Sequence, residues 1–463
     1  MPSKYLIHTR PVPNRFETIT KSGIIAWEEG CLKCPVCVKK KCVYEVYDNR
    51  MLDSRQMIES IDNQCRNCLR CVQNCPKELI HKSLNPEFGS LGDSHWTPDI
   101  IARLWYQAEN GKIPVSGAGY PGPFSGPGFD SMWTDMSEIV RPTRDGIHGR
   151  EYISTAVDLG RTSKNLMFND KGDLRNDMFL IDLPLPLIMR LPSFGAVTEE
   201  TLRGWATAAA HLDIMFAVPV EIFKNELAGF KSTLLPVASS KSEPEYLGHE
   251  VRLIEIIWEK GCEDFVREMK ALHPSSLISI RLPLFSDVGR IILPLIEMDI
   301  SIFHLEGSFM GMTFDREPLH VKDGLRNAHL ELVSHGIRDE ITLLASGGIS
   351  MAEHVPKAVI CGADAVVIDF PILIALECRM CHRCEQGIAC PVDIGEATSK
   401  WVSLRTINLM GAWHNQLLEV MGAMGIRDVR RLRGEAGRAI FFEELDKTMF
   451  GSLSKVKEGC ELE

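Results

Sequence analysis

The chain has 463 residues, of which 45% are hydrophobic and 24% are charged, with a net charge of −11. This length predicts two or three domains, one with room for a barrel of about 250 residues. The acidic balance and the lack of a long basic run argue against a nucleic-acid partner. No apolar run reaches the roughly 18 residues that span a bilayer, and the first 30 residues lack a signal-peptide pattern. We therefore expect a cytoplasmic protein without a membrane span.

Fifteen cysteines are many for a chain in a reducing compartment. Twelve of them fall in three tight groups, and this spacing favours metal ligation over disulfide bonds. The remaining three, Cys262, Cys361 and Cys460, stand alone. We interpret Cys262 and Cys361 as buried packing residues.

The first two cysteine groups define an expected ferredoxin-like domain over residues 1–95. Their members are Cys31, Cys34, Cys37 and Cys42, then Cys65, Cys68, Cys71 and Cys75. The second group, with Pro76 after it, has the C-x2-C-x2-C-x3-C-P spacing of bacterial ferredoxins, in which the fourth cysteine serves the other cluster. The first group departs from this spacing by one residue and has Val43 where proline is usual.

From this pattern we predict two 4Fe–4S clusters. One is expected on Cys31, Cys34, Cys37 and Cys75, and the other on Cys65, Cys68, Cys71 and Cys42. The alternative is a pair of zinc sites, but zinc sites use paired C-x2-C units and often histidine. Triplets that end in Cys-Pro therefore favour iron–sulfur clusters.

Residues 96–177 are predicted to lead into the next domain. Residues 97–110 indicate a helix with Thr97 as its N-cap and Pro98 at its first position. Residues 113–130 are dense in glycine and proline and predict an extended linker. Residues 137–155 are polar, and two interpretations stay open. They form a solvated loop, or a loop over a cofactor that turns one of four side chains toward an anion: Arg141, Arg144, His148 or Arg150.

Residues 178–377 alternate short apolar strands with helical stretches. The predicted strands are residues 185–191, 213–219, 232–238, 251–257, 277–283, 300–306, 341–347 and 365–369. Eight strands with crossover helices predict an α/β fold, a (β/α)8 TIM barrel. A doubly wound open sheet is the alternative.

In such a barrel the active site lies at the carboxyl ends of the strands. The candidate cofactor-binding residues there are Ser193, Phe194, Gly195, Ala196, Arg281, Gly307, Ser308, Ser346, Gly347, Gly348 and Asp369. The glycine pair at 347–348 precedes an expected helix start at 350–353, and backbone N–H groups in that setting favour a phosphate. Arg281 is either the cation beside a reduced flavin or an arginine paired inside the barrel. The weak candidates for catalysis are Glu306, Glu259 and His304.

The third cysteine group follows the last predicted strand and opens a C-terminal region over residues 378–463. Cys378, Cys381, Cys384 and Cys390 have the spacing C-x2-C-x2-C-x5-C-P and supply the four thiolates of a third iron–sulfur cluster. A zinc site is the alternative. After Thr398 we expect helices, including an arginine-rich stretch at 429–438 that is either a solvated face or a surface for a partner.

At these residues the chain resembles the archaeal-type, FMN-binding glutamate synthase group over nearly its whole length. The resemblance is carried by the ferredoxin groups and by residues 193–196, 345–349, 362–366, 381–382 and 390–392. It implies an N-terminal two-cluster ferredoxin and a barrel that binds FMN beside an iron–sulfur cluster. It also implies reduction of 2-iminoglutarate, formed from 2-oxoglutarate and ammonia, to glutamate.

The chain departs from this group where the substrate and the phosphate would bind. The group has a lysine at the position of Arg281 and an Asp-Gly-Gly-Thr-Gly stretch where this chain has residues 306–311. It has a glycine at the position of Asp369, whose carboxylate would repel a phosphate. The group's third cluster is a 3Fe–4S cluster on three cysteines, whereas here Cys384 lies between Cys381 and Cys390, so a 4Fe–4S or a 3Fe–4S cluster is expected.

Three hypotheses follow. The first is a glutamate synthase-like oxidoreductase in which electrons pass from the ferredoxin-type clusters through the third cluster to FMN. Its electron donor would be a redox partner protein: a ferredoxin, an NAD(P)H-oxidising subunit or a larger electron-transfer complex. The second is an electron-transfer subunit that has lost the substrate site, and the third is a barrel that has lost FMN and serves as a scaffold.

Overall fold

The computed structural model describes most of the chain from residue 68 onward. The described residues are 5–19, 21–27, 34, 36–37, 42–44, 46, 68–113, 126–134, 153–161, 168, 171–172, 180–225, 227–241, 244–435, 437 and 439–457. Two predicted cluster ligands, Cys31 and Cys65, lie outside them. Most of the predicted linker and the arginine-rich loop with Arg141, Arg144, His148 and Arg150 also lie outside.

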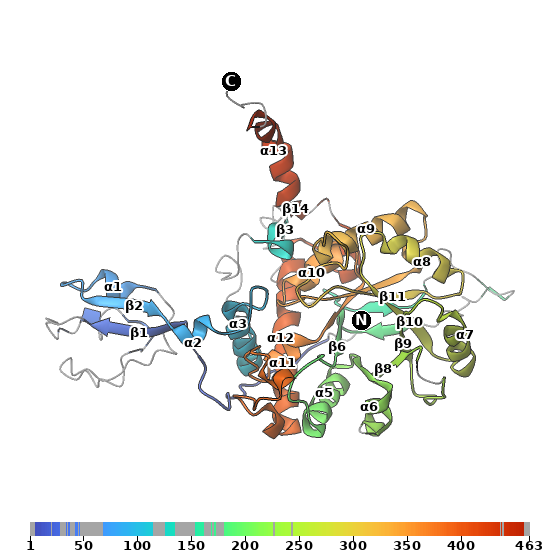
Figure 1. Ribbon diagram of the computed structural model, residues 1–463, viewed down its shortest axis with the longest axis horizontal. Coiled ribbons are helices and arrows are strands. Elements are labelled where there is room, and N and C mark those ends of the chain that lie inside the picture. The colour runs from blue at the N-terminus through green and yellow to red at the C-terminus, as the bar shows by residue number, and fades with distance from the viewer. Residues whose placement is uncertain are drawn as a thin grey trace.

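A closed barrel of parallel strands forms the centre of the described structure (Figure 1). Its strands are β6 (Leu187–Arg190), β7 (Phe216–Pro219), β8 (Leu234–Ser239), β9 (Leu253–Ile257), β10 (Leu277–Pro283), β11 (Ile302–Glu306), β12 (Thr342–Ser346) and β13 (Ala365–Ile368). The last strand pairs with the first, so that Ile368 lies beside Met189. The predicted (β/α)8 barrel is therefore confirmed, and the open sheet, which would leave two unpaired edges, is wrong.

The barrel strands are mostly apolar on both faces because helices cover the outside and side chains fill the inside. Every residue of β12 and β13 is buried. The helices that follow the strands are α5 (Glu199–Leu212), α6 (Val220–Asn225), α7 (Glu263–Leu272), α8 (Val288–Ile296), α9 (Val321–Ser334), α10 (His354–Ile360) and α11 (Phe370–Ile374). Helices α5, α7, α8 and α9 correspond to predicted crossover segments, whereas the described residues between β8 and β9 contain no helix.

The N-terminal part of the chain begins with an antiparallel strand pair. β1 (Ser22–Trp27) pairs with β2 (Ile80–Leu84), and the short helices α1 (Arg70–Gln73) and α2 (Pro86–Gly89) flank β2 in sequence. Figure 1 shows β1, β2 and α1 to one side of the barrel. Helix α3 (Pro98–Asn110) starts after Thr97 as predicted and ends at Gly111, whose φ of 66° is left-handed.

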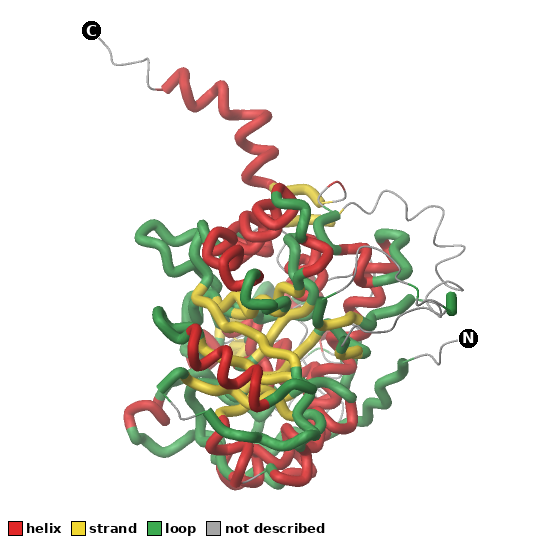
Figure 2. The backbone as a smooth tube through the Cα atoms, turned by 90° about the vertical axis from the view of Figure 1, so that its right-hand side faces the viewer, coloured by secondary structure: helices red, strands yellow, loops and turns green. Residues whose placement is uncertain are grey.

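The C-terminal region is helical for most of its described length. Helix α12 (Ser399–Ala423) packs against α5 and α3, and its N-cap Thr398 accepts from the N–H of Trp401. Strand β14 (Ala439–Phe441) pairs with β3 (Met132–Thr134), and helix α13 (Phe442–Lys457) then projects away from the barrel (Figure 2). None of the described helices is both long and apolar enough to cross a membrane.

The prediction that residues 429–438 continue as a helix is wrong. Among the described residues of this stretch only the short 3-10 helix η12 (Val429–Leu432) forms, and Gly434 then adopts a left-handed φ of 72° that ends it. Two arginines of this stretch, Arg430 and Arg433, form ion pairs within the chain. Arg430 pairs with Asp158 at 2.7 Å, and Arg433 pairs with Asp364 at 2.7 Å.

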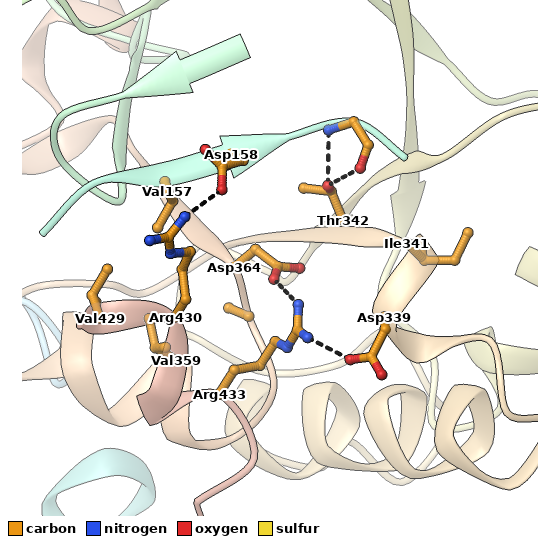
Figure 3. A pocket seen from close by; sticks show the side chains of 12 residues that line it. Val157, Asp158, Asp339, Ile341, Thr342, Val359, Asp364, Val429, Arg430 and Arg433 are labelled. Atoms are coloured by element: carbon orange, nitrogen blue, oxygen red, sulfur yellow. Dashed lines mark hydrogen bonds and ion pairs between the residues drawn. The ribbon is translucent and has the colours of Figure 1, made fainter. Parts of the chain in front are cut away.

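These ion pairs close the amino end of the barrel, opposite the candidate active site. The hairpin of β4 (Val157–Leu159) and β5 (Ile181–Leu183) lies there, and a cavity of about 180 Å³ separates it from η12 (Figure 3). Asp364, directly before β13, accepts from Arg433, from Arg338 at 2.9 Å and from the N–H of Leu343 at 2.7 Å. One buried carboxylate thus joins the barrel floor to the C-terminal segment.

Candidate active site at the barrel mouth

Charged side chains meet at the carboxyl ends of three barrel strands. Arg190 is the last residue of β6, Glu306 is the last residue of β11, and Asp369 directly follows β13. The Arg190 guanidinium donates to the carboxylate of Asp369 at 2.5 Å and makes a close contact with the carboxylate of Glu306. Strands that are distant in the sequence are therefore joined by one cation at the mouth of the barrel.

A second polar layer lies one step deeper. Arg281 of β10 donates to Glu255 of β9 at 2.7 Å, and its other nitrogen lies 3.8 Å from Glu306. The imidazole of His304 lies between Glu255, 2.6 Å from its Nδ1, and the hydroxyl of Ser346, 2.8 Å from its Nε2. Residues 304 and 306 lie two positions apart on β11 and therefore share the strand face that points into the barrel. The two layers thus form one network.

The pairing fixes the charges of this network. Burial opposes the charge on Arg190, but Asp369 and Glu306 raise the pKa of its guanidinium above the ordinary value. Burial also opposes ionisation of Glu255, and Arg281 and His304 nevertheless bring its pKa well below the usual range. The pKa of Glu306 is lowered in the same way, against burial, mainly by Arg190 and Arg281. Glu255 and Glu306 are thus held ionised by the cations beside them.

The predicted catalytic candidates take different positions. Glu306 lies in the mouth and is 29% exposed, whereas His304 is fully buried between its two partners and has no open side toward a substrate. Glu259 lies on the loop after β9, where it accepts from Ser240 at 2.9 Å and pairs with Lys241. Of the three, Glu306 alone combines a place in the network with solvent access.

Arg281 adopts the second of its two predicted arrangements, since it is paired inside the barrel with Glu255. Asp369 is also engaged. Besides Arg190, it accepts from the N–H of Phe370 at 2.7 Å and so caps α11. The negative charge that was expected to repel a phosphate is therefore offset by a neighbouring guanidinium.

The glycine pair after β12 is placed against the loop after β11. Both glycines have left-handed φ values, 100° for Gly347 and 63° for Gly348. A Cβ on Gly347 would lie 2.5 Å from the backbone of Gly307, and one on Gly348 would lie 2.4 Å from Gly311. Close approach of two loops thus accounts for glycine at both positions.

A second feature of this loop fits a bound anion. Ser350 follows the glycine pair by two positions. Its hydroxyl is buried and has no hydrogen-bond partner among the described residues. Helix α10 begins at His354, four residues later than the helix start expected at Ser350, because residues 350–353 turn before the helix. This buried, unpaired hydroxyl is a polar atom that a cofactor phosphate would satisfy.

Aromatic rings cover the same strand ends. The cluster contains Trp96, Phe194, Phe309, Phe370 and His382. Phe194 follows β6, and its ring centre lies 4.8 Å from that of Phe370 and 4.6 Å from that of His382. Since His382 lies within the third cysteine group, this aromatic cluster joins the barrel mouth to the cysteine loop.

The other predicted cofactor contacts lie on the same loops. Ser193 is exposed, Gly195 has φ 135° and faces Leu373, and Ala196 packs against the main core. The N–H of Ser308 donates to the carbonyl of Met312 at 2.8 Å, so the loop after β11 folds back on itself. The structure therefore brings the predicted loops together at one end of the barrel.

The third cysteine group forms a loop with unusual backbone. Met380 and His382, the residues before and after Cys381, have left-handed φ values of 51° and 54°. The N–H of Met380 donates to the Sγ of Cys378 at 3.4 Å. Burial raises the pKa of Cys378 to about 12, and the thiols of Cys381, Cys390 and Cys384 add to this rise. The other three thiols of the group thus lie within electrostatic range of Cys378.

The N-terminal cysteines that the structure describes also lie close together. Cys37, Cys42, Cys71 and Cys75 pack around Val46 and Ile80 in a small core separate from the barrel core. The Sγ of Cys75 accepts from the N–H of Leu79 at 3.4 Å. Burial opposes its ionisation, yet backbone N–H groups lower the pKa of Cys75, an environment that suits a thiolate ligand.

Within the described part of the chain, no three His, Cys, Asp or Glu side chains are arranged to hold a metal ion. The three clusters and the ferredoxin-like domain therefore stay predictions. The thiol chemistry and the backbone N–H donors at Cys75 and Cys378 are the features that fit them.

Two residues of the mouth were missed by sequence reasoning. Arg190 is the second-last residue of the predicted strand 185–191, and a charged residue in an otherwise apolar run was the available signal. His95 precedes α3, and its Nε2 lies 2.9 Å from the carbonyl oxygen of Gly348, on the loop after β12. Nothing in the sequence around His95 indicates that contact, which spans 253 residues.

Comparisons with known proteins find similarity to glutamate synthases. Residues 254–432 match the conserved region in glutamate synthase. The archaeal glutamate synthase (NADPH) of Archaeoglobus fulgidus is 24% identical, and the alignment covers 92% of this chain and 95% of that protein. The archaeal-type glutamate synthase (NADPH) of Dehalococcoides mccartyi is 25% identical, over 88% of this chain and 92% of that protein. A solved mandelate oxidase covers 65% of this chain and 97% of its own, but its identity of 14% and TM-score of 0.39 are too low to support any conclusion.

Proposed function

The chain is an oxidoreductase that resembles the archaeal-type glutamate synthase group, and from this premise we propose that it is an iron–sulfur flavoprotein which reduces an imine to an amine. Electrons would enter at two ferredoxin-type clusters, pass to a third cluster at Cys378–Cys390 and reach FMN at the barrel mouth. The electron donor would be a redox partner protein: a ferredoxin, an NAD(P)H-oxidising subunit or a larger electron-transfer complex.

One observation carries this proposal. The ring of His382, between the second and third cysteines of the C-terminal group, lies 4.6 Å from the ring of Phe194 at the barrel mouth. A cluster held by these cysteines would therefore adjoin the site where the strands end. This placement suits the transfer of single electrons into a cofactor at the mouth.

The chain offers a consistent set of groups for FMN. The loops at 193–196, 307–308 and 346–348 would hold it, and the buried hydroxyl of Ser350 would donate to its phosphate. When bound, FMN supplies a hydride and the clusters supply single electrons. The protein residues position the substrate, exclude water through the aromatic cluster, and keep Glu306 ionised beside Arg190.

The reaction implied by the resemblance is the reduction of the imine of 2-oxoglutarate and ammonia to glutamate. The alternative function is an electron-transfer subunit of a larger redox complex that has lost this substrate site. A specific observation favours the alternative: the two mouth arginines, Arg190 and Arg281, already pair with the chain's own carboxylates. Arg190 uses both of its terminal nitrogens on these carboxylates, and only Nη1 of Arg281, which lies 3.8 Å from Glu306, is left for a carboxylate from a substrate.

A reoxidation assay tests the proposal. Protein loaded with FMN and clusters is reduced anaerobically, and the flavin absorbance is followed after addition of 2-oxoglutarate with ammonium, or of other oxo compounds with ammonium. The proposal expects reoxidation by at least one pair, and none by either component alone. If the donor reduces the flavin but no imine reoxidises it, the chain is an electron-transfer subunit instead.

A further inference from the structure

The imidazole of His95 packs against both loops that would hold the cofactor. Its Nε2 lies 2.9 Å from the carbonyl oxygen of Gly348, on the loop after β12. A Cβ on Gly311, on the loop after β11, would lie 3.3 Å from the same ring. Burial lowers the pKa of His95, so the ring is neutral at pH 7 and carries one proton. Because a carbonyl oxygen only accepts hydrogen bonds, that proton is on Nε2 and is donated to Gly348.

The carbonyl of Gly348 sets the direction of the N–H group that follows it. The described chain contains no cis peptide bond, and in a planar trans peptide the C=O and the N–H point in opposite directions. A carbonyl held toward His95 therefore turns the N–H of Ile349 away from His95. This N–H, like those of Gly347 and Gly348, donates to no group among the described residues, and all three residues are buried. Buried N–H groups are nearly always paired, so these three are available to a bound anion.

The next residue supplies a fourth donor. Ser350 is 1% exposed, and its hydroxyl has no partner among the described residues. Its own N–H is already used, because it donates to Nδ1 of His354 at 3.4 Å. The side chain of Ser350, rather than its backbone, is thus left for a ligand. Three N–H groups and one hydroxyl along four consecutive residues suit the acceptor oxygens of a phosphate.

The turn that carries His95 is fixed on both sides. The carboxylate of Asp93 accepts from the N–H of His95 at 2.7 Å and from that of Trp96 at 2.8 Å. The N–H of Gly92 donates to the carbonyl of Arg379, within the third cysteine group, at 3.1 Å. Trp96 is fully buried in the aromatic cluster. The position of the imidazole is therefore set by contacts with the cysteine loop and with the barrel mouth.

From this arrangement we propose that His95 is a positioning residue for the flavin phosphate, because it orients the peptide after Gly348 so that the N–H of Ile349 is presented to the phosphate. The inference rests on the proposed function, since it concerns the cofactor of the same site. It assigns part of the cofactor site to a segment that precedes α3. The N-terminal part of the chain would thus complete a phosphate site that the barrel loops alone leave unset.

Two flavins that differ only in the phosphate test this inference without turnover. FMN and riboflavin are each titrated into full-length protein that has been stripped of flavin, and binding is followed by the change in flavin fluorescence. Wild-type protein is expected to bind FMN more tightly than riboflavin. Inorganic phosphate is expected to compete with FMN and to leave riboflavin binding unchanged.

Two variants separate the hydrogen bond of His95 from the packing of its ring. His95→Phe keeps a ring beside Trp96, 5.4 Å from it in the wild type, and removes the N–H donor. It is expected to weaken FMN binding by about tenfold, the order for one contact to a charged group, and to leave riboflavin binding unchanged. His95→Gln loses the ring but keeps an N–H donor, and is expected to restore most of the FMN affinity.

His335→Ala is the matched control. It removes an exposed imidazole that contacts the carbonyl of Glu331 on its own helix, and it is expected to change neither affinity. Circular dichroism checks that each variant keeps the fold. If the His95 variants do not fold, Asp93→Ala replaces them, because it releases the turn but leaves the imidazole in the chain. It is expected to weaken the binding of FMN alone.

The inference is overturned if His95→Phe keeps the wild-type preference for FMN over riboflavin. An equal loss for both flavins, or a Gln variant that binds FMN more weakly than the Phe variant, would also overturn it, since either result means that the ring only packs. If wild-type protein binds neither flavin, the proposed function is refuted as well. If wild-type protein binds FMN and one of the other results is found, only this inference is refuted.

Discussion

Replacing Asp364 by alanine is expected to lower the free energy of unfolding by about 3–5 kcal/mol, the usual cost of breaking a buried ion pair from one side. The carboxylate of Asp364 is the shared acceptor of Arg338, Arg433 and the N–H of Leu343. Arg338 is 4% exposed, so the substitution would leave a buried guanidinium without its counter-charge. The measurement is urea unfolding followed by circular dichroism.

Asp339→Ala is the matched control. Asp339 pairs with the same Arg433 at 2.8 Å, but its side chain is 78% exposed, and an exposed pair of this kind is worth about 0–1 kcal/mol. The acid sensitivity has a definite sign as well. Burial raises the pKa of Asp364, but Arg338 and Arg433 lower it below the ordinary value. The stability that Asp364 contributes is therefore fully present above the pKa of this carboxyl in the unfolded chain, and it is lost as the pH falls through the lower pKa of the folded protein. Equal losses in the two variants would contradict this account of the barrel floor.

Replacing Cys381 by alanine is expected to reduce donor-driven flavin reduction to the background rate. Cys381 is the predicted ligand beside His382, the residue that contacts the barrel mouth. A 4Fe–4S cluster that loses one of four thiolates is destabilised or lost, and the path from the N-terminal clusters to the flavin is then broken. Stopped-flow absorbance with a reduced ferredoxin as donor measures the rate, while direct reduction by dithionite should be unaffected.

The matched control for this variant is Cys262→Ala. Cys262 is a buried cysteine next to α7, outside the three groups, so its removal changes packing but no predicted ligand. It is expected to keep both the iron content and the donor-driven rate. If the flavin of the Cys381→Ala protein is still reduced by the donor at the unaltered rate, the third cluster does not lie on the electron path.

The barrel could be predicted from the sequence because its cause is local and repeated. Each strand is a short, mostly apolar run with β-branched residues, and helical patterns separate most of the strands, so period and spacing were sufficient. The start of α3 is another local case. Thr97 and Pro98 mark it in the sequence, and the helix begins at Pro98.

The polar network could not be predicted because its contacts are made between strands. Arg190 pairs with Glu306 and Asp369, which lie 116 and 179 residues further along the chain. A period of two identifies which residues point inward, but it does not tell which inward charge meets which. The helix prediction for 429–438 failed for the same reason. The tertiary partners of Arg430 and Arg433 outweigh the helical propensity of their stretch.

The cofactor content of anaerobically purified protein tests the central claim most directly. FMN is measured by fluorescence after acid release, and iron is measured on the same sample. The account predicts about one FMN and roughly twelve irons per chain, as three 4Fe–4S clusters require. Iron without FMN would contradict the account. The charged network at Arg190 and Glu306 would then lie at the mouth of a barrel that binds no flavin, and the chain would be an electron relay or a scaffold.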